Sequence, residues 1–266
     1  MSLAGAGQTV SEDVITAQRA ALAANTMGKG FGPQSPRDID ATFGTNDLSF
    51  APAPPYRRMN LCNIHLHSGA EHRGGEFRTY AGPGDGKGYG TGYVYSGEIS
   101  SLEKTELRYK VGDSKHGSLH PGDTIEVHYV YSTANVALGP TLGACLEDGA
   151  PTPRLRVETQ VFVLVNLPTA EDFVELTEIG MRDGLHQAVN LPNTSGAPVQ
   201  YAGSTTGPEY NEADSPFLVT WSVRPNILKL DIKTLHQWFQ DNPFEEDHAH
   251  GVRNLVTNPA LLSGLD

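Results

Sequence analysis

Four short segments of this sequence have the composition and patterning of β-strands, and they constrain the fold more than any other feature. They are rich in valine, isoleucine, threonine and tyrosine, which β-structure favours. Two of them place polar residues at alternate positions, and the other two are apolar almost throughout, as strands buried on both faces are. The segments are RMNLCNIHLH (58–67), DTIEVHYVYST (123–133), VETQVFVLVNL (157–167) and FLVTWSVRP (217–225). With 29 glycines and 18 prolines available for turns, the sequence predicts a mainly β protein.

Two helices are expected at the periphery of the sheet. Residues 11–25 begin with Ser11, a residue type that caps helices, and continue through good helix formers. Residues 231–242 carry a stripe of large apolar side chains at helical spacing. The stripe consists of Ile232, Leu235, Trp238 and Phe239. We therefore expect a short N-terminal helix and a surface helix packed through one side.

The chain shows no sign of a division into several domains. No low-complexity linker interrupts its 266 residues, although residues 78–100 are so rich in glycine that they predict an inserted long loop or flexible hairpin. We expect an N-terminal arm at residues 1–31 and a single domain at residues 32–266.

Charge and hydropathy exclude several classes of partner. The formal charge of −12 argues against nucleic acid, because phosphate binding needs clustered lysine and arginine and none cluster here. No stretch approaches the ~20 consecutive apolar residues of a membrane helix. The first residues, MSLAGAGQTVSEDV, lack the basic and apolar regions of a signal peptide. We therefore expect neither a membrane span nor a nucleic-acid partner.

Histidines in two of the predicted strands suggest a metal site. Alternation along 58–67 turns Asn63, His65 and His67 to one face. The same rule turns Cys62, Ile64 and Leu66 to the other face. His128 lies in the middle of an otherwise apolar strand, where an unpaired imidazole would be costly. Asn63 and Glu126 each precede a histidine by two positions, so each can orient an imidazole from the same face.

The spacing permits two metal architectures. In the first, His65, His67 and His128 bind zinc and leave a fourth position open for water, as in catalytic zinc sites. In the second, Glu71 is a fourth ligand, as in the cupin pattern, and the metal is iron or manganese. Local spacing does not separate these two alternatives.

Five motifs, taken together, resemble a known family. The segments GPQSPRDID, NIHLHSGAEH, IEVHYVY, YAGSTTGP and VTWSV are similar, in the same order, to motifs of α-class carbonic anhydrases. The segments GFGPQSPRDI, HSGAEHRGGEF, VTWSVRP and EDHAHGVRNLVTNPALL resemble the δ-class, or carbonic-anhydrase-like, family more closely. The resemblance implies an α-carbonic-anhydrase-like fold with a central, mostly antiparallel twisted sheet. It also implies reversible hydration of carbon dioxide to bicarbonate and a proton by zinc-bound hydroxide.

The resemblance also assigns roles to individual residues. It implies zinc ligands at His65, His67 and His128, oriented in part by Asn63 and Glu126. It implies that Thr205 accepts a hydrogen bond from the hydroxide and that Glu71 accepts the proton of Thr205. The residues that match the apolar wall of the carbon dioxide pocket are Val130, Val161, Val163 and Trp221.

The resemblance leaves other functional features open. A histidine is suited to carry protons to solvent, and the candidates are His72, His116, His120, His248 and His250. Ser68 and Ser204 replace residues that are apolar in the α-class pattern. A non-catalytic binding module with this fold is a further alternative, whose signature would be the loss of a ligand.

The two cysteines bear on the cellular compartment. Cys62 and Cys145 either form a disulfide or remain buried free thiols, and the sequence does not separate these alternatives. A disulfide would favour a periplasmic or secreted location.

Overall fold

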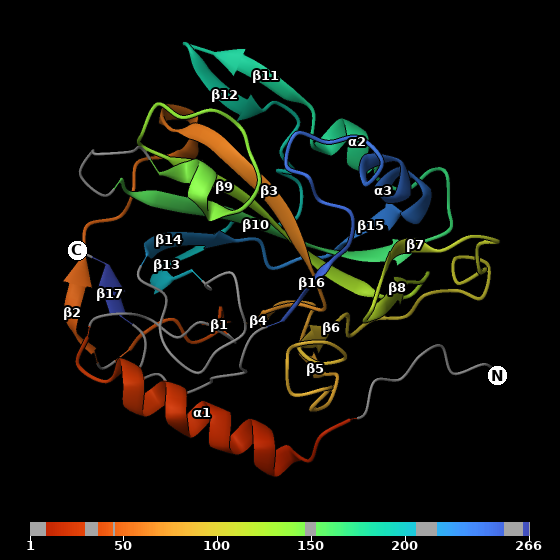
Figure 1. Cartoon of the computed structure of the whole chain (residues 1–266), viewed down its shortest axis with the longest axis horizontal. Coiled ribbons are helices and arrows are strands. Elements are labelled where there is room, and N and C mark those ends of the chain that lie inside the picture. The colour runs from red at the N-terminus through yellow and green to blue at the C-terminus, as the bar shows by residue number, and fades with distance from the viewer. Residues whose placement is uncertain are drawn as a thin grey trace.

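The central element of the fold is a nine-stranded sheet (Figure 1). The structure, a computed structural model, describes residues 9–29, 37–44, 46–146, 153–205, 217–252 and 263–265. In the order in which they pair, the strands are β16 (His250–Gly251), β3 (Asn60–Ser68), β9 (Thr124–Ser132), β10 (Leu155–Val165), β14 (Leu218–Val223), β13 (Val199–Ser204), β17 (Ser263–Leu265) and β2 (Asn46–Phe50), and β15 (Leu228–Asp231) also pairs with β10. The four segments predicted as strands form β3, β9, β10 and β14, so the predicted mainly β fold is confirmed.

The sheet is mixed in strand direction. β9 pairs antiparallel with both β3 and β10, and β13 pairs antiparallel with β14. However, β10 is parallel to both β14 and β15, and β16 is parallel to β3. The parallel pairs join strands from distant parts of the chain, and local patterning predicts no such pairs. The expectation of a mostly antiparallel sheet is confirmed by the long pairings of β9 with β3 and β10 and of β13 with β14, although the sheet as a whole is mixed rather than purely antiparallel.

In the described part of the chain, four short strand pairs lie outside the central sheet. They are β1 (Arg37–Asp38) with β4 (His72–Arg73), β5 (Thr79–Tyr80) with β6 (Tyr93–Val94), β7 (Val111–Ser114) with β8 (Gly117–Leu119), and β11 (Ile179–Arg182) with β12 (Leu185–Ala188). The β5–β6 pair closes the glycine-dense segment into a hairpin, which is one of the two forms predicted for it. We call residues 79–94 the glycine-rich hairpin.

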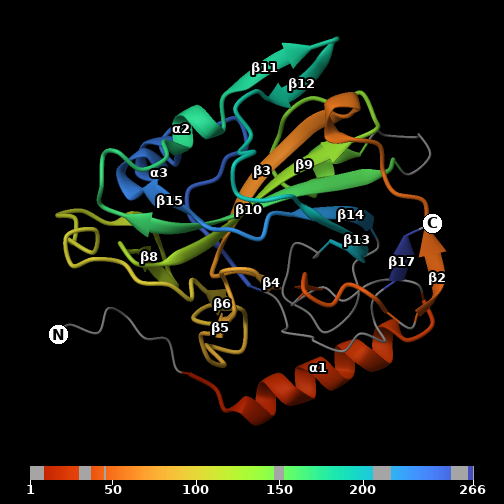
Figure 2. The same cartoon turned by 180° about the vertical axis from the view of Figure 1, so that it is seen from behind.

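The helices lie at the periphery, as predicted. They are α1 (Glu12–Thr26), α2 (Phe173–Leu176) and α3 (Ile232–Trp238), with 3-10 turns η1 (Tyr56–Arg58) and η2 (Leu142–Cys145). Helix α1 lies on the opposite side of the molecule from α2 and α3 in both views (Figures 1 and 2). None of the helices in the described residues is long and apolar enough to cross a membrane. The proposed boundary at residues 31 and 32 falls outside the described residues and stays a prediction.

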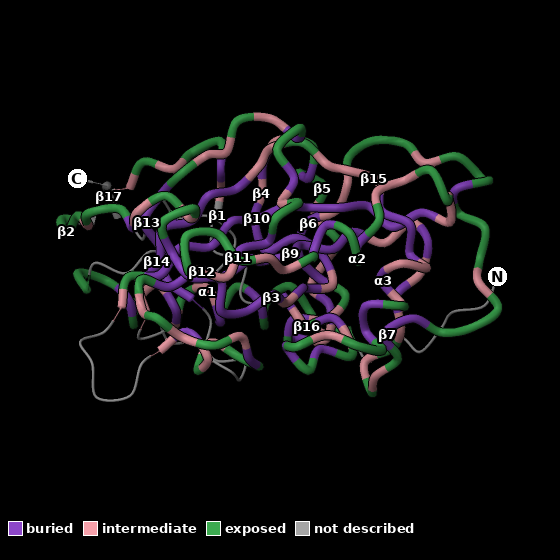
Figure 3. Tube along the Cα trace, turned by 90° about the horizontal axis from the view of Figure 1, so that it is seen from above, coloured by how far each residue is buried: buried purple, intermediate pink, exposed green. Residues whose placement is uncertain are grey.

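Two apolar clusters pack on the two faces of the sheet, so its central strands are buried (Figure 3). On one face, Val127 and Tyr129 of β9 pack with side chains of α2 and α3. On the other face, Val130 packs with Val161 of β10 and Trp221 of β14. Because side chains alternate along β9, this second face is also the one that carries Glu126 and His128. Among the described residues, none of the side chains in the second cluster comes from an α-helix.

A bulge in β3 corrects one prediction of side-chain direction. The pairing of β3 with β9 shifts register between Leu61 and Asn63. A bulge inserts one extra residue and changes the alternation at that point. Cys62 therefore packs in the second cluster, whereas Ile64 packs in the first. The prediction that Cys62 shares a face with Ile64 and Leu66 was wrong.

The bulged residue is joined covalently to the loop after β9. Cys62 forms a disulfide with Cys145 at the end of η2. The Gly139 N–H donates to the Cys62 carbonyl at 3.1 Å, so the loop also contacts β3 beside the disulfide. Of the two states that the sequence left open for these cysteines, the structure has the disulfide, which is compatible with an extracellular location.

Candidate metal centre

Three histidine side chains converge on one face of the central sheet. His65 and His67 lie two residues apart on β3, so both turn toward the same face. β9 runs antiparallel beside β3 and places His128 directly opposite His65. One ring nitrogen from each of the three side chains lies within 4.8 Å of the others. The register between two strands that are far apart in the chain thus assembles the predicted set of ligands.

Asn63 orients the first ring. Its side-chain Oδ1 lies 2.6 Å from His65 Nδ1, and its own Nδ2 donates to the Gly139 carbonyl at 3.0 Å. The bond to Gly139 fixes which way the amide faces, so Oδ1 accepts a hydrogen bond from the N–H of His65 Nδ1. The lone pair of His65 is then on Nε2, which lies 3.2 Å from His128 Nδ1.

Glu126 orients His128. Its Oε1 lies 2.6 Å from His128 Nε2, and the carboxylate also accepts from the backbone N–H of His72 at 3.0 Å. Burial alone raises the pKa of this carboxyl group, but His72 and His128 outweigh burial and hold the pKa well below its ordinary value. An ionised Glu126 can only accept hydrogen bonds, so His128 carries its proton on Nε2 and its lone pair on Nδ1.

The backbone carbonyl of Gly251 orients His67. Gly251 lies on strand β16, which pairs with the end of β3, and its carbonyl oxygen lies 3.1 Å from His67 Nδ1. Because a carbonyl oxygen can only accept, Nδ1 carries the proton and Nε2 the lone pair. Among the described residues, His67 Nε2 has no hydrogen-bond partner although it is buried. Buried polar atoms without a partner are rare in folded proteins.

The residues present fit a divalent transition metal. The three orienting contacts leave lone pairs on Nε2 of His65, Nε2 of His67 and Nδ1 of His128, and the first and third of these atoms lie 3.2 Å apart. Lone pairs held this close repel unless a cation lies between them. Three imidazole nitrogens with no further protein ligand are the donor set of several catalytic zinc sites, and imidazole also suits copper, iron and nickel.

The protonation of the rings agrees with this arrangement. Burial lowers the pKa of both His65 and His67 well below the ordinary value for histidine, and the closeness of His128 lowers it further, because positive charges on neighbouring rings would repel one another. Both rings are therefore neutral at pH 7, as a histidine must be to bind a metal ion.

Glu71 and Thr205 are buried. Glu71 Oε1 lies 3.5 Å from His67 Nδ1, on the side of the ring away from the Nε2 lone pair. Within the described residues, the set of ligand atoms that lie within 4.8 Å of one another at this site contains the three histidines but not the Glu71 carboxylate. Thr205 follows directly after β13, where its N–H donates to the Phe217 carbonyl at 3.0 Å. The segment after it, residues 206–216, lies outside the described residues.

Apolar side chains surround the histidines on this face. Val161 lies directly opposite Glu126, and Val163 lies opposite Thr124, in the pairing of β10 with β9. The Trp221 ring centroid is 5.0 Å from that of His128. All four residues predicted for the substrate pocket are buried, and they are Val130, Val161, Val163 and Trp221.

The five histidines proposed as proton carriers differ in burial and in their contacts. His72 is fully buried, with Nδ1 bonded to Glu126 and Nε2 bonded to the Tyr201 hydroxyl, each at 2.7 Å. The His250 ring centroid is 5.8 Å from that of His65, and its side chain is 46% exposed. The remaining three form other contacts, His116 with Tyr89, His120 with Glu106, and His248 with Asp247. Among the five, only His250 has a ring contact with a proposed ligand within the described residues.

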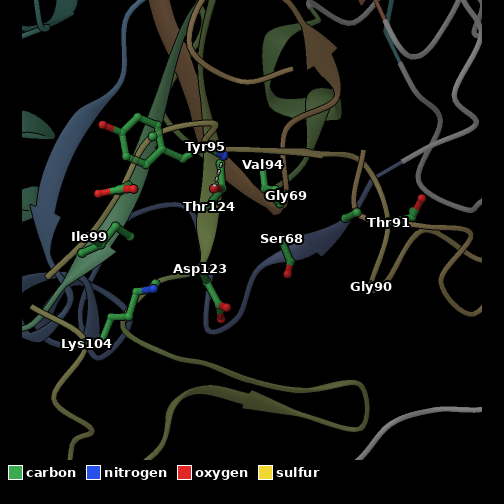
Figure 4. A pocket seen from close by; sticks show the side chains of 14 residues that line it. Ser68, Gly69, Gly90, Thr91, Val94, Tyr95, Ile99, Lys104, Asp123 and Thr124 are labelled. Atoms are coloured by element: carbon green, nitrogen blue, oxygen red, sulfur yellow. Dashed lines mark hydrogen bonds between the residues drawn. The ribbon is translucent and has the colours of Figure 1, made fainter. Parts of the chain in front are cut away.

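A separate pocket of about 620 Å³ opens beside the end of β3 (Figure 4). Ser68, Gly69 and Thr124 line it, and the Tyr95 N–H donates to Thr124 Oγ1 at 2.9 Å in its wall. None of the proposed ligands or predicted apolar pocket residues lines this pocket. This pocket is therefore distinct from the candidate metal centre.

Two partners in this centre were not predicted from the sequence. The Gly251 carbonyl orients His67, and the Tyr201 hydroxyl bonds to His72, which in turn bonds to Glu126. No side-chain pattern marks a backbone carbonyl as an orienting group. Tyr201 lies in one of the quoted motifs, YAGSTTGP, but nothing in its spacing indicates a contact with His72.

A comparison with models of protein families agrees with the motifs. The sequence model of the family described as delta carbonic anhydrase matches residues 56–234. A solved structure, Photobacterium profundum alpha-carbonic anhydrase, is similar at 15% identity over 84% of this chain and 92% of that chain, with a TM-score of 0.28. A TM-score this low supports no conclusion about the fold. The search of curated proteins found no match.

Proposed function

Because this chain belongs to the delta carbonic anhydrase family, we propose that it hydrates carbon dioxide reversibly at a zinc ion held by His65, His67 and His128. The observation that supports the proposal is the convergence of three imidazole lone pairs, each set by a hydrogen bond on the other side of its ring. Zinc is the metal that a site with this donor set and an open fourth position commonly binds.

When bound, zinc supplies a Lewis acid that makes a water molecule acidic near neutral pH, which is its established role in carbonic anhydrases. The protein's own part is to hold the three rings in one orientation. Asn63, Glu126 and the Gly251 carbonyl each accept a hydrogen bond from a ring N–H group. Such contacts keep the rings in the tautomer needed for metal binding and increase their basicity.

Thr205 and Glu71 orient the attacking oxygen in this proposal. A carboxylate oxygen of Glu71 accepts a hydrogen bond from the Thr205 hydroxyl, so that Oγ1 must in turn accept a hydrogen bond from the nucleophile. The lone pair of the nucleophile then faces carbon dioxide. Both side chains are buried, with exposures of 1% for Glu71 and 3% for Thr205. Burial strengthens hydrogen bonds of this kind, because water does not compete for them.

The apolar side chains on this face exclude water from the substrate. Carbon dioxide has no charge, so a wall of Val130, Val161 and Trp221 is suited to hold it. These three side chains belong to one buried cluster next to His128. Val163 is proposed for the same wall from its position in β10.

The placement of Glu71 bears on the alternative with a fourth protein ligand. A cupin-like iron or manganese site needs Glu71 beside the lone pairs of the histidines. Glu71 instead approaches the Nδ1 side of His67, which favours the three-histidine arrangement. A non-catalytic binding module is expected to lack a ligand, and all three histidines are present and converge.

We propose an oxidising compartment, periplasmic or extracellular, for this protein. The disulfide between Cys62 and Cys145 supports the proposal, because disulfides persist in such compartments and are rare in reducing ones.

Removal and return of the metal test the proposed function. We expect protein stripped by a chelator to lose carbon dioxide hydration, measured by stopped-flow with a pH indicator. About one equivalent of zinc per chain should restore it. Restoration by iron or manganese but not by zinc would support the four-ligand alternative. A zinc-loaded protein without hydration activity would support the alternative of a non-catalytic binding module.

A further inference from the structure

The carbonyl that orients His67 is held in place by the glycine-rich hairpin. Gly251 lies in β16, and β16 lies beside β3, close to the hairpin between β5 and β6 (Figure 1). The next residue, Val252, donates its N–H to the Gly88 carbonyl at 2.7 Å. The segment that carries the Gly251 carbonyl is therefore bonded to β3 on one side and contacts Gly88 on the other.

The contact at Gly88 requires a residue without a side chain. Gly88 has φ of +104°, a backbone conformation that other residues rarely adopt. A Cβ atom at this position would lie 2.0 Å from the Val252 carbonyl oxygen and 3.0 Å from the Gly251 carbonyl carbon. Any side chain at residue 88 would thus push the segment 251–252 away from the hairpin, and with it the carbonyl that His67 needs.

The turn around Gly88 is fixed by Asp85. Its Oδ1 accepts from the backbone N–H groups of Lys87 at 2.8 Å and Tyr89 at 3.1 Å. The Asp85 N–H donates to the Tyr89 carbonyl at 3.0 Å. These bonds close the hairpin tip on both sides of Gly88, so the position of its carbonyl is defined by the hairpin itself.

Val252 is enclosed by the same hairpin. Its side chain is fully buried, and Cβ atoms at Gly92 and Gly69 would lie 3.0 Å and 3.4 Å from its Cγ2. Gly69 comes two residues after His67. The hairpin therefore contacts both the segment that follows the ligand and the segment that orients it.

We propose that Gly88 is a positioning residue for the metal centre. Through the bond to Val252 it holds the Gly251 carbonyl against His67 Nδ1, which keeps the proton on Nδ1 and leaves Nε2 for the metal ion. The proposal rests on the proposed function, because it assumes that His67 is a ligand. It gives the glycine-rich hairpin a role in the reaction that the sequence motifs did not provide.

Two alanine variants test the proposal. Gly82 lies in the same hairpin with φ of +108°, and a Cβ there would meet nothing within 4 Å. Gly82→Ala thus also places a side chain at a positive φ, but without the contact to Val252. We expect Gly88→Ala to bind zinc about 10- to 100-fold more weakly, as loss of an orienting contact usually does. Gly82→Ala should bind zinc as the wild type does.

A second measurement uses the zinc-free protein and needs no activity. The ¹⁵N chemical shifts of the His67 ring report which nitrogen carries the proton. We expect a single tautomer with the proton on Nδ1 in the wild type and in Gly82→Ala, and a mixture of tautomers in Gly88→Ala. A merely structural role for the hairpin would lower the stability of both variants and leave the tautomer unchanged.

Asp85 supplies a milder pair of variants if Gly88→Ala does not fold. Asp85→Asn keeps a side-chain oxygen to accept from Lys87 and Tyr89, whereas Asp85→Ala removes it. We expect weaker zinc binding in Asp85→Ala and wild-type affinity in Asp85→Asn. Asn at this position also removes the charge that lies 3.8 Å from His116, so retention of affinity shows that the turn matters and the charge does not.

The outcomes separate this proposal from the proposed function. Wild-type affinity and a single His67 tautomer in Gly88→Ala would overturn the role of Gly88 while zinc binding stands. Equal losses in Gly88→Ala and Gly82→Ala would overturn it as well. A wild-type protein that binds no zinc would contradict the proposed function, and the tautomer measurement would still decide whether Gly88 acts on His67.

Discussion

Replacing His128 by alanine is expected to abolish both zinc binding and carbon dioxide hydration. His128 is the proposed ligand from the second strand, and its Nδ1 lies 3.2 Å from His65 Nε2. Without it, two imidazoles on one strand remain, and Glu126 is left buried without the ring that it orients. The loss of zinc affinity should exceed the roughly 10- to 100-fold effect of losing an orienting contact.

A histidine on the other face of the sheet provides the control for His128→Ala. His236 lies in α3, which packs against the first cluster rather than the metal face. His236→Ala should bind zinc and hydrate carbon dioxide as the wild type does. Zinc affinity is measured by competition with a chromophoric chelator, and hydration by stopped-flow. Unchanged zinc affinity in His128→Ala would remove this residue from the set of ligands.

Replacing Glu71 by glutamine is expected to lower turnover by about 10²-fold or more while zinc stays bound. Glutamine has the same shape, but its amide can donate a hydrogen bond where the relay needs an acceptor only. Thr205 would then no longer be forced to accept from the nucleophile. Zinc content is measured on the same samples, because the four-ligand alternative requires metal loss in this variant.

A double-mutant cycle shows whether Glu71 and Thr205 act as one unit. Thr205→Val removes the hydroxyl and keeps the shape of the side chain. If the two residues form a relay, the double variant should be about as active as the less active of the two single variants, because either change alone already breaks the relay. Losses that multiply in the double variant would show two independent roles and would contradict the relay.

The sequence predicted the parts of the site that depend on strand alternation. His65 and His67 share a face because they lie two residues apart on a strand, and His128 shares a face with Glu126 for the same reason. The assembly of the three histidines depends on the register of β3 against β9. Alternation within each strand does not determine that register, so the convergence itself came from the family resemblance and the structure.

Features that depend on long-range backbone contacts were not predictable from the sequence. The bulge at Cys62 comes from the register shift beside it, and alternation placed that residue on the wrong face. The Gly251 carbonyl reaches His67 through the parallel pairing of β16 with β3. A backbone oxygen has no signature in the sequence, and neither has the bond from Val252 to Gly88 that supports it.

The composition of the glycine-rich hairpin predicts its irregular or hairpin form but not the role of each glycine. Its many glycines predict an irregular or hairpin segment, and the structure has a hairpin closed by two short strands. The reason for glycine at a given position is visible only in its contacts. At Gly88 it is the approach of the Val252 carbonyl, whereas at Gly82 no neighbouring atom requires a glycine.

Anomalous diffraction at the zinc absorption edge, from crystals of the zinc-loaded protein, tests the central claim most directly. The account predicts one strong peak at about 2.0–2.1 Å from Nε2 of His65, Nε2 of His67 and Nδ1 of His128, with no carboxylate oxygen of Glu71 at bonding distance. A peak elsewhere, or Glu71 bound directly to the ion, would contradict the three-histidine centre.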